Sequence, residues 1–202
     1  MGKTSMALNV ALSAARESGK TVAIFSLEMS KEQLVTRLLA NEGLIENTRL
    51  ATGNLRESDW EKIAQAASVL NQTNIRIDDN PLLTVADMNA KCRRLENLGL
   101  VVIDYLQLMN SAKRIDNRVQ EISEITRSLK IMAKELNIPV VTLAQLARAG
   151  EKRQEHRPVL SDLRDSGSIE QDADIVLFLY REGYYNRDTE NPNLAECIIA
   201  KN

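Results

Sequence analysis

The sequence predicts an α/β domain with a doubly wound, mostly parallel sheet and an antiparallel extension at one edge. Runs rich in Val, Ile and Leu alternate with segments of helical periodicity as far as residue 145, an order typical of parallel strands covered by helices on both faces. Two further apolar runs follow each other across a polar turn, which favours a hairpin. The 202 residues show no internal repeat or linker-like tract, so we expect one domain.

Four segments in the first half combine an apolar stripe with a capping residue or a glycine stop, and we predict helices there: Ser5–Ser18, Ser30–Ala40, Ser58–Leu70 and Thr84–Leu95. Ser30 and Gln33 have the spacing of a capping box. Trp60 belongs to the apolar stripe of its helix, which predicts a core position rather than a base-stacking one. The strands predicted in this half are Thr21–Leu27, Asn74–Ile77 and a strand that begins at Leu100 and ends at Asp104, within the stretch 100–108.

The elements predicted in the second half are a long helix over Val119–Leu136 and strands over Pro139–Gln145, Ala173–Tyr180 and Ala195–Lys201. The stretch Arg148–Arg157 is basic and loop-like. It either adds positive field to a functional loop at Ser161–Ser168 or is a solvated surface loop. Arg181, Tyr184 and Tyr185 either stack on a base or belong to a surface hairpin.

Composition limits the classes of partner and compartment. The net charge is −2, so nucleic-acid binding must come from local clusters rather than from the overall field. Cys92 and Cys197 lie far apart in apolar-patterned segments, which predicts buried thiols in a reducing compartment and no zinc site. No apolar run reaches the roughly 20 residues that span a bilayer, and no signal-peptide pattern opens the chain. We therefore expect no membrane association and a cytoplasmic location.

Polar side chains follow three of the predicted strands. The apolar run that begins at Leu100 leads into Asp104, the strand from Thr21 leads into Glu28, and Gln145 ends the strand from Pro139. In open α/β sheets the carboxyl ends of parallel strands share one edge, and ligands bind there. The sequence thus predicts a site at this edge, although a core strand ending in a surface carboxylate remains an alternative.

Gly2-Lys3-Thr4 has the ending of a phosphate-binding loop, which combines backbone N–H groups, a lysine for phosphate and a hydroxyl for Mg²⁺. A complete loop also has a preceding strand and an earlier glycine, whereas only Met1 precedes Gly2. Three explanations remain open: a chain cut inside the loop, a start at the point where the loop becomes ordered, or a spurious match. The pairing with Asp104 favours the first.

Five segments in order resemble the ATPase domain of bacterial DnaB-type replicative helicases: Gly-Lys-Thr-Ser at 2–5, Phe-Ser-Leu-Glu-Met-Ser at 25–30, Val-Val-Ile-Asp-Tyr-Leu-Gln-Leu at 101–108, Thr-Leu-Ala-Gln-Leu at 142–146 and Asp-Leu-Arg-Asp-Ser-Gly-Ser-Ile-Glu-Gln-Asp-Ala-Asp at 162–174. The resemblance implies a RecA-like P-loop NTPase fold. Ser-Leu-Glu-Met-Ser separates this family from the RecA and RadA recombinases, which share the fold.

The resemblance also implies a nucleotide site for ATP and Mg²⁺. Gly2, Lys3, Thr4 and Ser5 would bind ATP, with Lys3 on the β- and γ-phosphates. Thr4 and Asp104 would hold the metal ion. Glu28 would polarise the attacking water, because phosphoryl transfer depends on positioning and charge stabilisation.

Further roles implied by the resemblance connect this site to DNA and to neighbouring subunits. Gln145 would sense the γ-phosphate, and Lys201 would reach the site of a neighbour. Arg164, Asp165 and Gly167 would grip the backbone of single-stranded DNA, with Gly167 allowing close approach. The partners implied are single-stranded DNA, further copies in a homo-hexamer, a primase and a helicase loader.

Residues 1–202 are thus predicted to be one RecA-like helicase ATPase domain, truncated at both ends. The front of the phosphate loop and an arginine expected after Asn202 are absent, so we expect little ATPase activity from these residues alone. Two alternatives remain: a recombinase-like or clock-type RecA-fold ATPase, and a nucleotide-binding oligomerisation module without turnover.

Overall fold

The computed structural model describes residues 2–112, 115–147, 153, 156–186 and 188–202. Its helices are α1 Lys3–Ser18, α2 Lys31–Glu42, α3 Asn47–Thr52, α4 Glu57–Asn71, α5 Val85–Cys92, α6 Arg118–Leu136 and α7 Gly167–Asp172. Its strands are β1 Thr21–Ser26, β2 Ile75–Asp78, β3 Leu98–Asp104, β4 Val140–Thr142, β5 Val176–Tyr180 and β6 Glu196–Lys201. Short 3₁₀ helices are η1 Leu106–Leu108, η3 Leu160–Ser166 and η4 Glu182–Tyr184.

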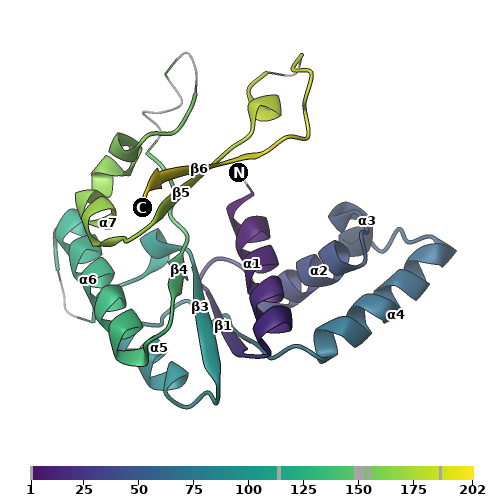
Figure 1. Cartoon of the computed structure of the whole chain (residues 1–202), viewed down its shortest axis with the longest axis horizontal. Helices are drawn as coiled ribbons and strands as arrows, with labels where there is room; N and C mark the ends of the chain where they lie inside the picture. Colours follow the sequence, from purple (N-terminus) through teal and green to yellow (C-terminus); the bar gives the residue numbers. More distant parts are fainter. Residues whose placement is uncertain (1, 113–114, 148–152, 154–155, 187) are drawn as a thin grey trace.

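The strands form two sheets. Four parallel strands have the order β2-β1-β3-β4, and β5 pairs with β6 in an antiparallel hairpin. The predicted parallel sheet and hairpin are both confirmed. Within the described residues the hairpin is a separate two-stranded sheet, and it lies at the same end of the molecule as the start of α1 (Figure 1).

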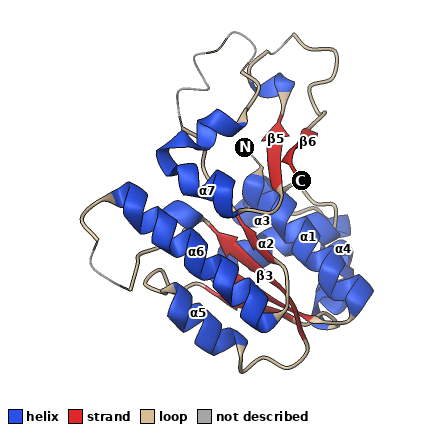
Figure 2. Ribbon diagram, turned by 60° about the vertical axis from the view of Figure 1, so that its left-hand side comes forward, coloured by secondary structure: helices blue, strands red, loops and turns tan. Residues whose placement is uncertain are grey.

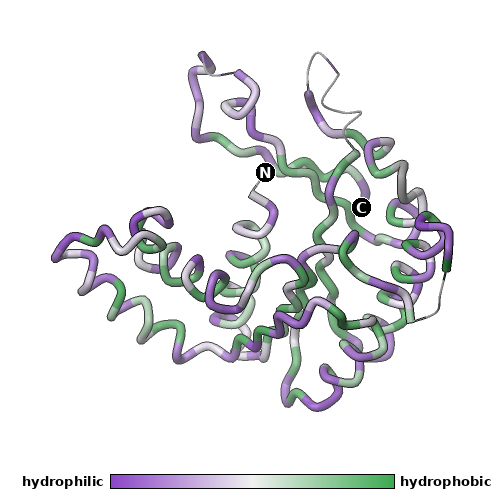
Figure 3. The backbone as a smooth tube through the Cα atoms, turned by 180° about the vertical axis from the view of Figure 1, so that it is seen from behind, coloured by the Kyte–Doolittle hydropathy of each residue, from purple (hydrophilic) through white to green (hydrophobic). Residues whose placement is uncertain are grey.

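Helices cover both faces of the parallel sheet, as a doubly wound fold requires (Figures 1 and 2). Val101 and Ile103 of β3 pack on the face covered by α5 and α6, whereas Leu100 and Val102 pack on the face covered by α1 and α2. Both faces of β3 are therefore apolar, which explains its uninterrupted hydrophobic run. Figure 3 shows the hydrophobic residues concentrated along the central strands.

The predicted capping signals lie at the helix ends. The Ser30 side chain accepts a hydrogen bond from the Gln33 N–H, and the Gln33 carboxamide accepts one from the Ser30 N–H, so the predicted capping box is confirmed. Thr84 caps α5 in the same way, with Asp87 as its partner. Gly19 adopts a left-handed conformation, φ 64°, and ends α1.

Several predicted boundaries are wrong. The central strand ends at Asp104 as predicted, but it begins at Leu98 rather than at Leu100, and after Asp104 the chain turns into η1 and buries Leu106. Among the other strands, the one expected over Pro139–Gln145 is limited to Val140–Thr142, and the one expected from Ala173 begins at Val176. The short helices α3 and α7 were not predicted.

Two predicted core positions are also wrong. Trp60 is 62% exposed, because α4 packs through Ala66 and turns the Trp60 side of its stripe outward. Cys92 is buried as predicted, but Cys197 is exposed on the hairpin strand β6. No helix among the described residues is long and apolar enough to cross a membrane.

Candidate functional site

Thr4 and Asp104 meet at the carboxyl edge of the parallel sheet. The Thr4 hydroxyl, in the first turn of α1, donates a hydrogen bond of 2.6 Å to Asp104 Oδ2 at the end of β3. Asp104 is 3% exposed, and its second oxygen, Oδ1, is buried without a hydrogen-bond partner. The two residues predicted to share a metal ion are thus in direct contact, and the Oδ1 atom of Asp104 is free to bind a cation.

Lys3 lies next to this pair. Its Nζ is 4.9 Å from the centre of the Tyr105 ring, within the range of a cation–π contact. Partial burial lowers the pKa of the Lys3 ammonium below its usual value, while the nearby charges of Asp104 and Glu28 act in the opposite direction. A half-buried cation therefore faces two acids at the N-terminal end of a helix, where the backbone also favours anions.

Glu28 lies in the turn after β1, the strand that pairs with the Asp104 strand. Ser26 and Asp104 are register partners in β1 and β3, and the Leu27 N–H donates a 2.7 Å hydrogen bond to the Asp104 carbonyl. The Ser26 hydroxyl donates to the Met29 carbonyl at 2.7 Å, and this contact closes the turn that carries Glu28. Glu28 is exposed at that turn, so its carboxylate can reach a ligand at the sheet edge.

Gln145 follows β4 at the same edge and is also exposed. Its backbone carbonyl accepts a hydrogen bond from Gln107 Nε2 at 2.9 Å, and its N–H donates to Gln107 Oε1 at 3.1 Å. The structure therefore brings the nucleotide-site residues predicted after β1, β3 and β4 to one edge of the sheet. Gln107 and Tyr105 are neighbours of the site that were not predicted to take part, although both lie in the segment 101–108.

The predicted DNA loop lies in η3 and at the start of α7. Its backbone contacts the segment that follows β4, because the Ala147 N–H donates to the Asp162 carbonyl at 3.0 Å. The side chains of Arg164 and Asp165 lie outside the described part of the structure. Gly167 has a helical φ of −52°, and a Cβ added to it would meet no atom within 4 Å. The protein itself thus leaves room at this glycine.

Lys201 lies near the end of β6 with its ammonium bound inside the same chain. Lys201 Nζ donates to the carbonyls of Glu170 and Ala173 at 2.7 Å and of Gln171 at 3.3 Å. The carbonyls of Glu170 and Gln171 are in the last turn of α7 and that of Ala173 follows it directly, a position where a cation is favourable. The arrangement gives Lys201 a structural contact in the single chain, and its predicted contact with a neighbour stays a prediction.

The basic stretch is described only in part: residues 148–152, 154 and 155 lie outside the described residues. Arg157 forms an ion pair with Glu196 and lies 5.0 Å from the centre of the Tyr180 ring. His156 stacks on Tyr185, with ring centres 4.4 Å apart. His156 and Arg157, at the end of the stretch, therefore contact the strands and the turn of the hairpin.

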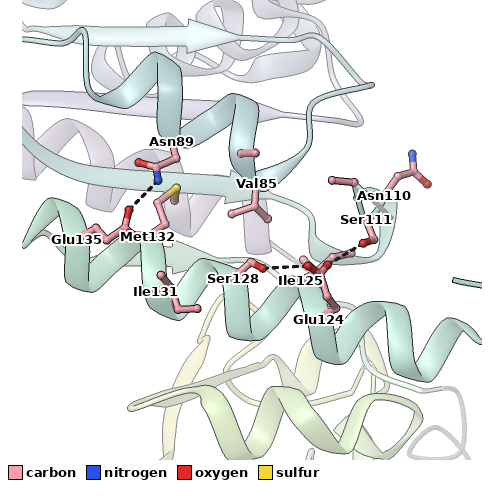
Figure 4. Close-up of a pocket in the computed structure, with 12 residues that line it drawn as sticks. Val85, Asn89, Asn110, Ser111, Glu124, Ile125, Ser128, Ile131, Met132 and Glu135 are labelled. Carbon is pink, nitrogen blue, oxygen red and sulfur yellow. Dashed lines mark hydrogen bonds between the residues drawn. The ribbon is translucent and has the colours of Figure 1, made fainter. Parts of the chain in front are cut away.

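A pocket of about 190 Å³ lies between α5 and α6, away from the predicted site (Figure 4). Apolar residues such as Val85 and Ile125 line it together with polar ones. Its two carboxylates already have partners, since Glu124 accepts from Ser111 and Glu135 accepts from Asn89. None of the predicted site residues lines this pocket.

A sequence model of the family described as DnaB-like helicase C terminal domain matches residues 1–202. The chain is 55% identical to the replicative DNA helicase DnaB of Geobacillus stearothermophilus and 54% identical to the replicative DNA helicase DnaC of Bacillus subtilis. Each alignment covers 100% of this chain and 45% of the relative. The chain therefore spans less than half the length of these relatives.

Solved structures give the same result. One solved ATPase domain is similar with a TM-score of 0.93 and 41% identity, over 99% of this chain and 72% of that one. A DnaB-like replicative helicase has a TM-score of 0.94 and 41% identity, over 100% of this chain and 51% of that one. The RadB recombinase has a TM-score of 0.53 and 19% identity, over 99% of this chain and 76% of that one. This similarity shows a shared fold alone. The family expected from the five motifs is confirmed: the chain belongs to the DnaB-like helicase C-terminal domains.

Proposed function

We propose that the chain is the ATP-hydrolysing motor part of a replicative DNA helicase and that it binds ATP with Mg²⁺ at the carboxyl edge of its parallel sheet. The hydrogen bond of 2.6 Å between Thr4 and Asp104 carries this proposal, because it joins a helix start to a strand end where the fold places ligands. Family membership supports the reaction class.

The residues at this edge fit Mg²⁺. Hard divalent cations prefer oxygen ligands, and the Thr4 hydroxyl and the Asp104 carboxylate are both available, the latter with one buried oxygen free of hydrogen bonds. When bound, Mg²⁺ neutralises phosphate charge and orients the terminal phosphoryl group. Thr4 and Asp104 would hold the ion, and Asp104 can do so directly or through water.

The remaining residues divide the work of hydrolysis. Gly2, Lys3 and Ser5 begin α1, so its first N–H groups and the Lys3 ammonium would bind the phosphates. Glu28, on an exposed turn one strand away from Asp104, would orient the attacking water and take its proton. Gln145 would contact the terminal phosphate from the segment that follows β4.

We include single-stranded DNA, a homo-hexamer, a primase and a helicase loader among the partners of the whole protein. One similar structure concerns a DnaB-like replicative helicase and its interactions with primase, which supports a primase as a partner by analogy. Arg164, Asp165 and Gly167 are the proposed DNA contacts, and Lys201 is the proposed contact to a neighbouring site.

The test is a comparison of ATP hydrolysis and strand separation by the whole protein, rather than by residues 1–202 alone, with and without single-stranded DNA. We expect DNA-stimulated hydrolysis and ATP-dependent unwinding. Nucleotide binding without hydrolysis would favour an oligomerisation module, and strand exchange without unwinding would favour a recombinase. Either result would contradict the proposal.

A further inference from the structure

The backbone of Gln145 lies just beyond the hydrogen-bond ladder of the sheet. Leu143 still pairs with the central strand, since its N–H donates to the Ile103 carbonyl and its carbonyl accepts from the Leu106 N–H, both at 2.9 Å. At Leu106 the chain turns into η1 and leaves the ladder. Gln145, two residues further along, therefore needs other partners for its backbone.

The Gln107 side chain supplies those partners. Its Oε1 accepts from the Gln145 N–H at 3.1 Å, and its Nε2 donates to the Gln145 carbonyl at 2.9 Å. A carboxamide carries an acceptor and a donor side by side, as a peptide group does, so one side chain can replace one strand residue. Both backbone groups of Gln145 are thereby fixed, while Gln145 itself remains exposed at the sheet edge.

Gln107 is itself held by α6. Arg118 Nη2 donates to the Gln107 carbonyl at 2.8 Å, and Nη1 of the same side chain donates to the Met109 carbonyl at 3.1 Å. Arg118 also forms an ion pair with Glu121, one turn along α6. The η1 turn is thus fixed by a guanidinium, and through it the Gln107 side chain has a defined position.

We infer that Gln107 is a positioning residue for ATP hydrolysis, which acts by fixing the backbone from which Gln145 reaches the terminal phosphate. This inference rests on the proposed function. Gln107 is not among the residues assigned to nucleotide or metal; its side-chain hydrogen bonds go to Gln145. Its loss should therefore affect the chemical step and spare nucleotide binding, which depends on Lys3, Thr4 and Asp104.

The first test compares Gln107→Leu and Gln107→Glu with Gln120→Leu, a matched control on the exposed start of α6. Gln107→Leu should lower kcat for ATP hydrolysis about ten- to hundredfold, the size expected when a contact to the reacting group is misplaced by about 1 Å. Gln107→Glu keeps the acceptor but has no donor, so its loss should be intermediate. Mg-ATP affinity should stay unchanged in all three, and Gln120→Leu should keep its kcat.

The second test is a double-mutant cycle with Gln145→Ala. If Gln107 acts through Gln145, adding Gln107→Leu to Gln145→Ala should cause no further loss of kcat, because residues that act as a unit are not additive. A general structural effect of Gln107 would instead lower kcat by the same factor in both backgrounds.

Three results of these two tests would contradict the proposed role of Gln107. Additive losses, an equal loss of Mg-ATP affinity, or an active Gln107→Leu beside a defective Gln145→Ala would overturn the role of Gln107. If Gln107→Leu does not fold, Gln107→Glu is judged by the same criteria. All variants are made in the whole protein. If the whole wild-type protein does not hydrolyse ATP, the proposed function is overturned and this inference with it, and that case is distinguished because the wild type itself is inactive.

Discussion

The buried Asp104 carboxylate is the residue on which the proposed site depends most. One oxygen accepts from Thr4, and the other is buried without a hydrogen bond. Leaving a buried polar atom unpaired costs about 1–3 kcal/mol, so such an atom calls for a partner outside the chain. A cation at this position satisfies the free oxygen, and the half-buried Lys3 beside it is suited to the accompanying phosphates.

Replacing Lys3 should weaken nucleotide binding itself. The ammonium would contact phosphate in the ground state as well as in the transition state, and a charged hydrogen bond contributes about 1.5–3 kcal/mol. Lys3→Ala should therefore raise the Kd for Mg-ATP roughly tenfold or more, measured by titration with a fluorescent nucleotide. Lys62→Ala, on the exposed face of α4, is the control. Equal affinities of wild type and Lys3→Ala would count against a phosphate site here.

The two thiols should react at very different rates. Burial raises the pKa of Cys92 to about 11, so little reactive thiolate forms at about pH 8, whereas Cys197 is exposed. Iodoacetamide should modify Cys197 first, and mass spectrometry after digestion should locate the label. Between about pH 9 and about 11 the unfolded chain binds fewer protons at Cys92 than the folded one, so stability should fall as pH rises. Equally fast labelling of both thiols in the folded protein would contradict this.

Among the elements, the central strand explains why much of the fold was predictable. The apolar faces of β3 pack on helices from both sides, so its hydrophobic run marked a buried parallel strand. Its end was predictable as well, because Asp104 is the first charged residue after the run, even though Leu106 and Met109 in and after η1 are as buried as strand residues. The contact between Gln107 and Gln145 was not predictable from the sequence, because the two residues lie 38 positions apart and meet only through the pairing of β3 with β4.

The hairpin and α7 are joined by Lys201. Its ammonium donates to three carbonyls at the end of α7, and hydrogen bonds to a charged group contribute about 1.5–3 kcal/mol. Because Lys201 is partly exposed, Lys201→Met should lower the free energy of unfolding by about 1.5 kcal/mol, measured by denaturant unfolding. Faster amide exchange in β6 should accompany the loss, and Lys201→Arg should retain part of the stability. An unchanged midpoint in Lys201→Met would show that the contact contributes nothing.

At the scale of the whole molecule, parallel strands bring distant segments to one edge. The sequence predicted four site residues, at the start of the first helix and after three strands: Lys3, Glu28, Asp104 and Gln145. The strand order then places them together at the carboxyl edge of the sheet. Trp60 shows the opposite case. Its position in the apolar stripe of α4 predicted a buried side chain, yet α4 packs through Ala66 and leaves Trp60 exposed. Helical periodicity identifies an apolar stripe but does not show which part of that stripe other elements cover.

The DNA loop should give two distinct effects on single-stranded DNA binding. Arg164→Ala should weaken binding to all sequences and reduce the slope of log K against log salt by about 0.7, the value for one phosphate contact on a single strand. Gly167→Val should also weaken binding, because its side chain would block the close approach of the DNA backbone. It should leave the slope unchanged, because it removes no charge. The fold should tolerate it, because the structure has room for a side chain at this position. Fluorescence anisotropy at several salt concentrations measures both, with Arg127→Ala on α6 as control. An unchanged slope in Arg164→Ala would contradict a phosphate contact.

Nucleotide binding is assigned to Lys3, Thr4 and Asp104, and activation of water is assigned to Glu28. The most direct test measures Mg-ATP affinity and hydrolysis together in Glu28→Gln. Glu17→Gln, at an exposed position of α1, is the control. Since a general base contributes about 10²–10⁴ in rate, turnover should fall by at least the lower figure while affinity stays within error of wild type. A Glu28→Gln protein that loses binding together with turnover, or that keeps both, would contradict this division of roles.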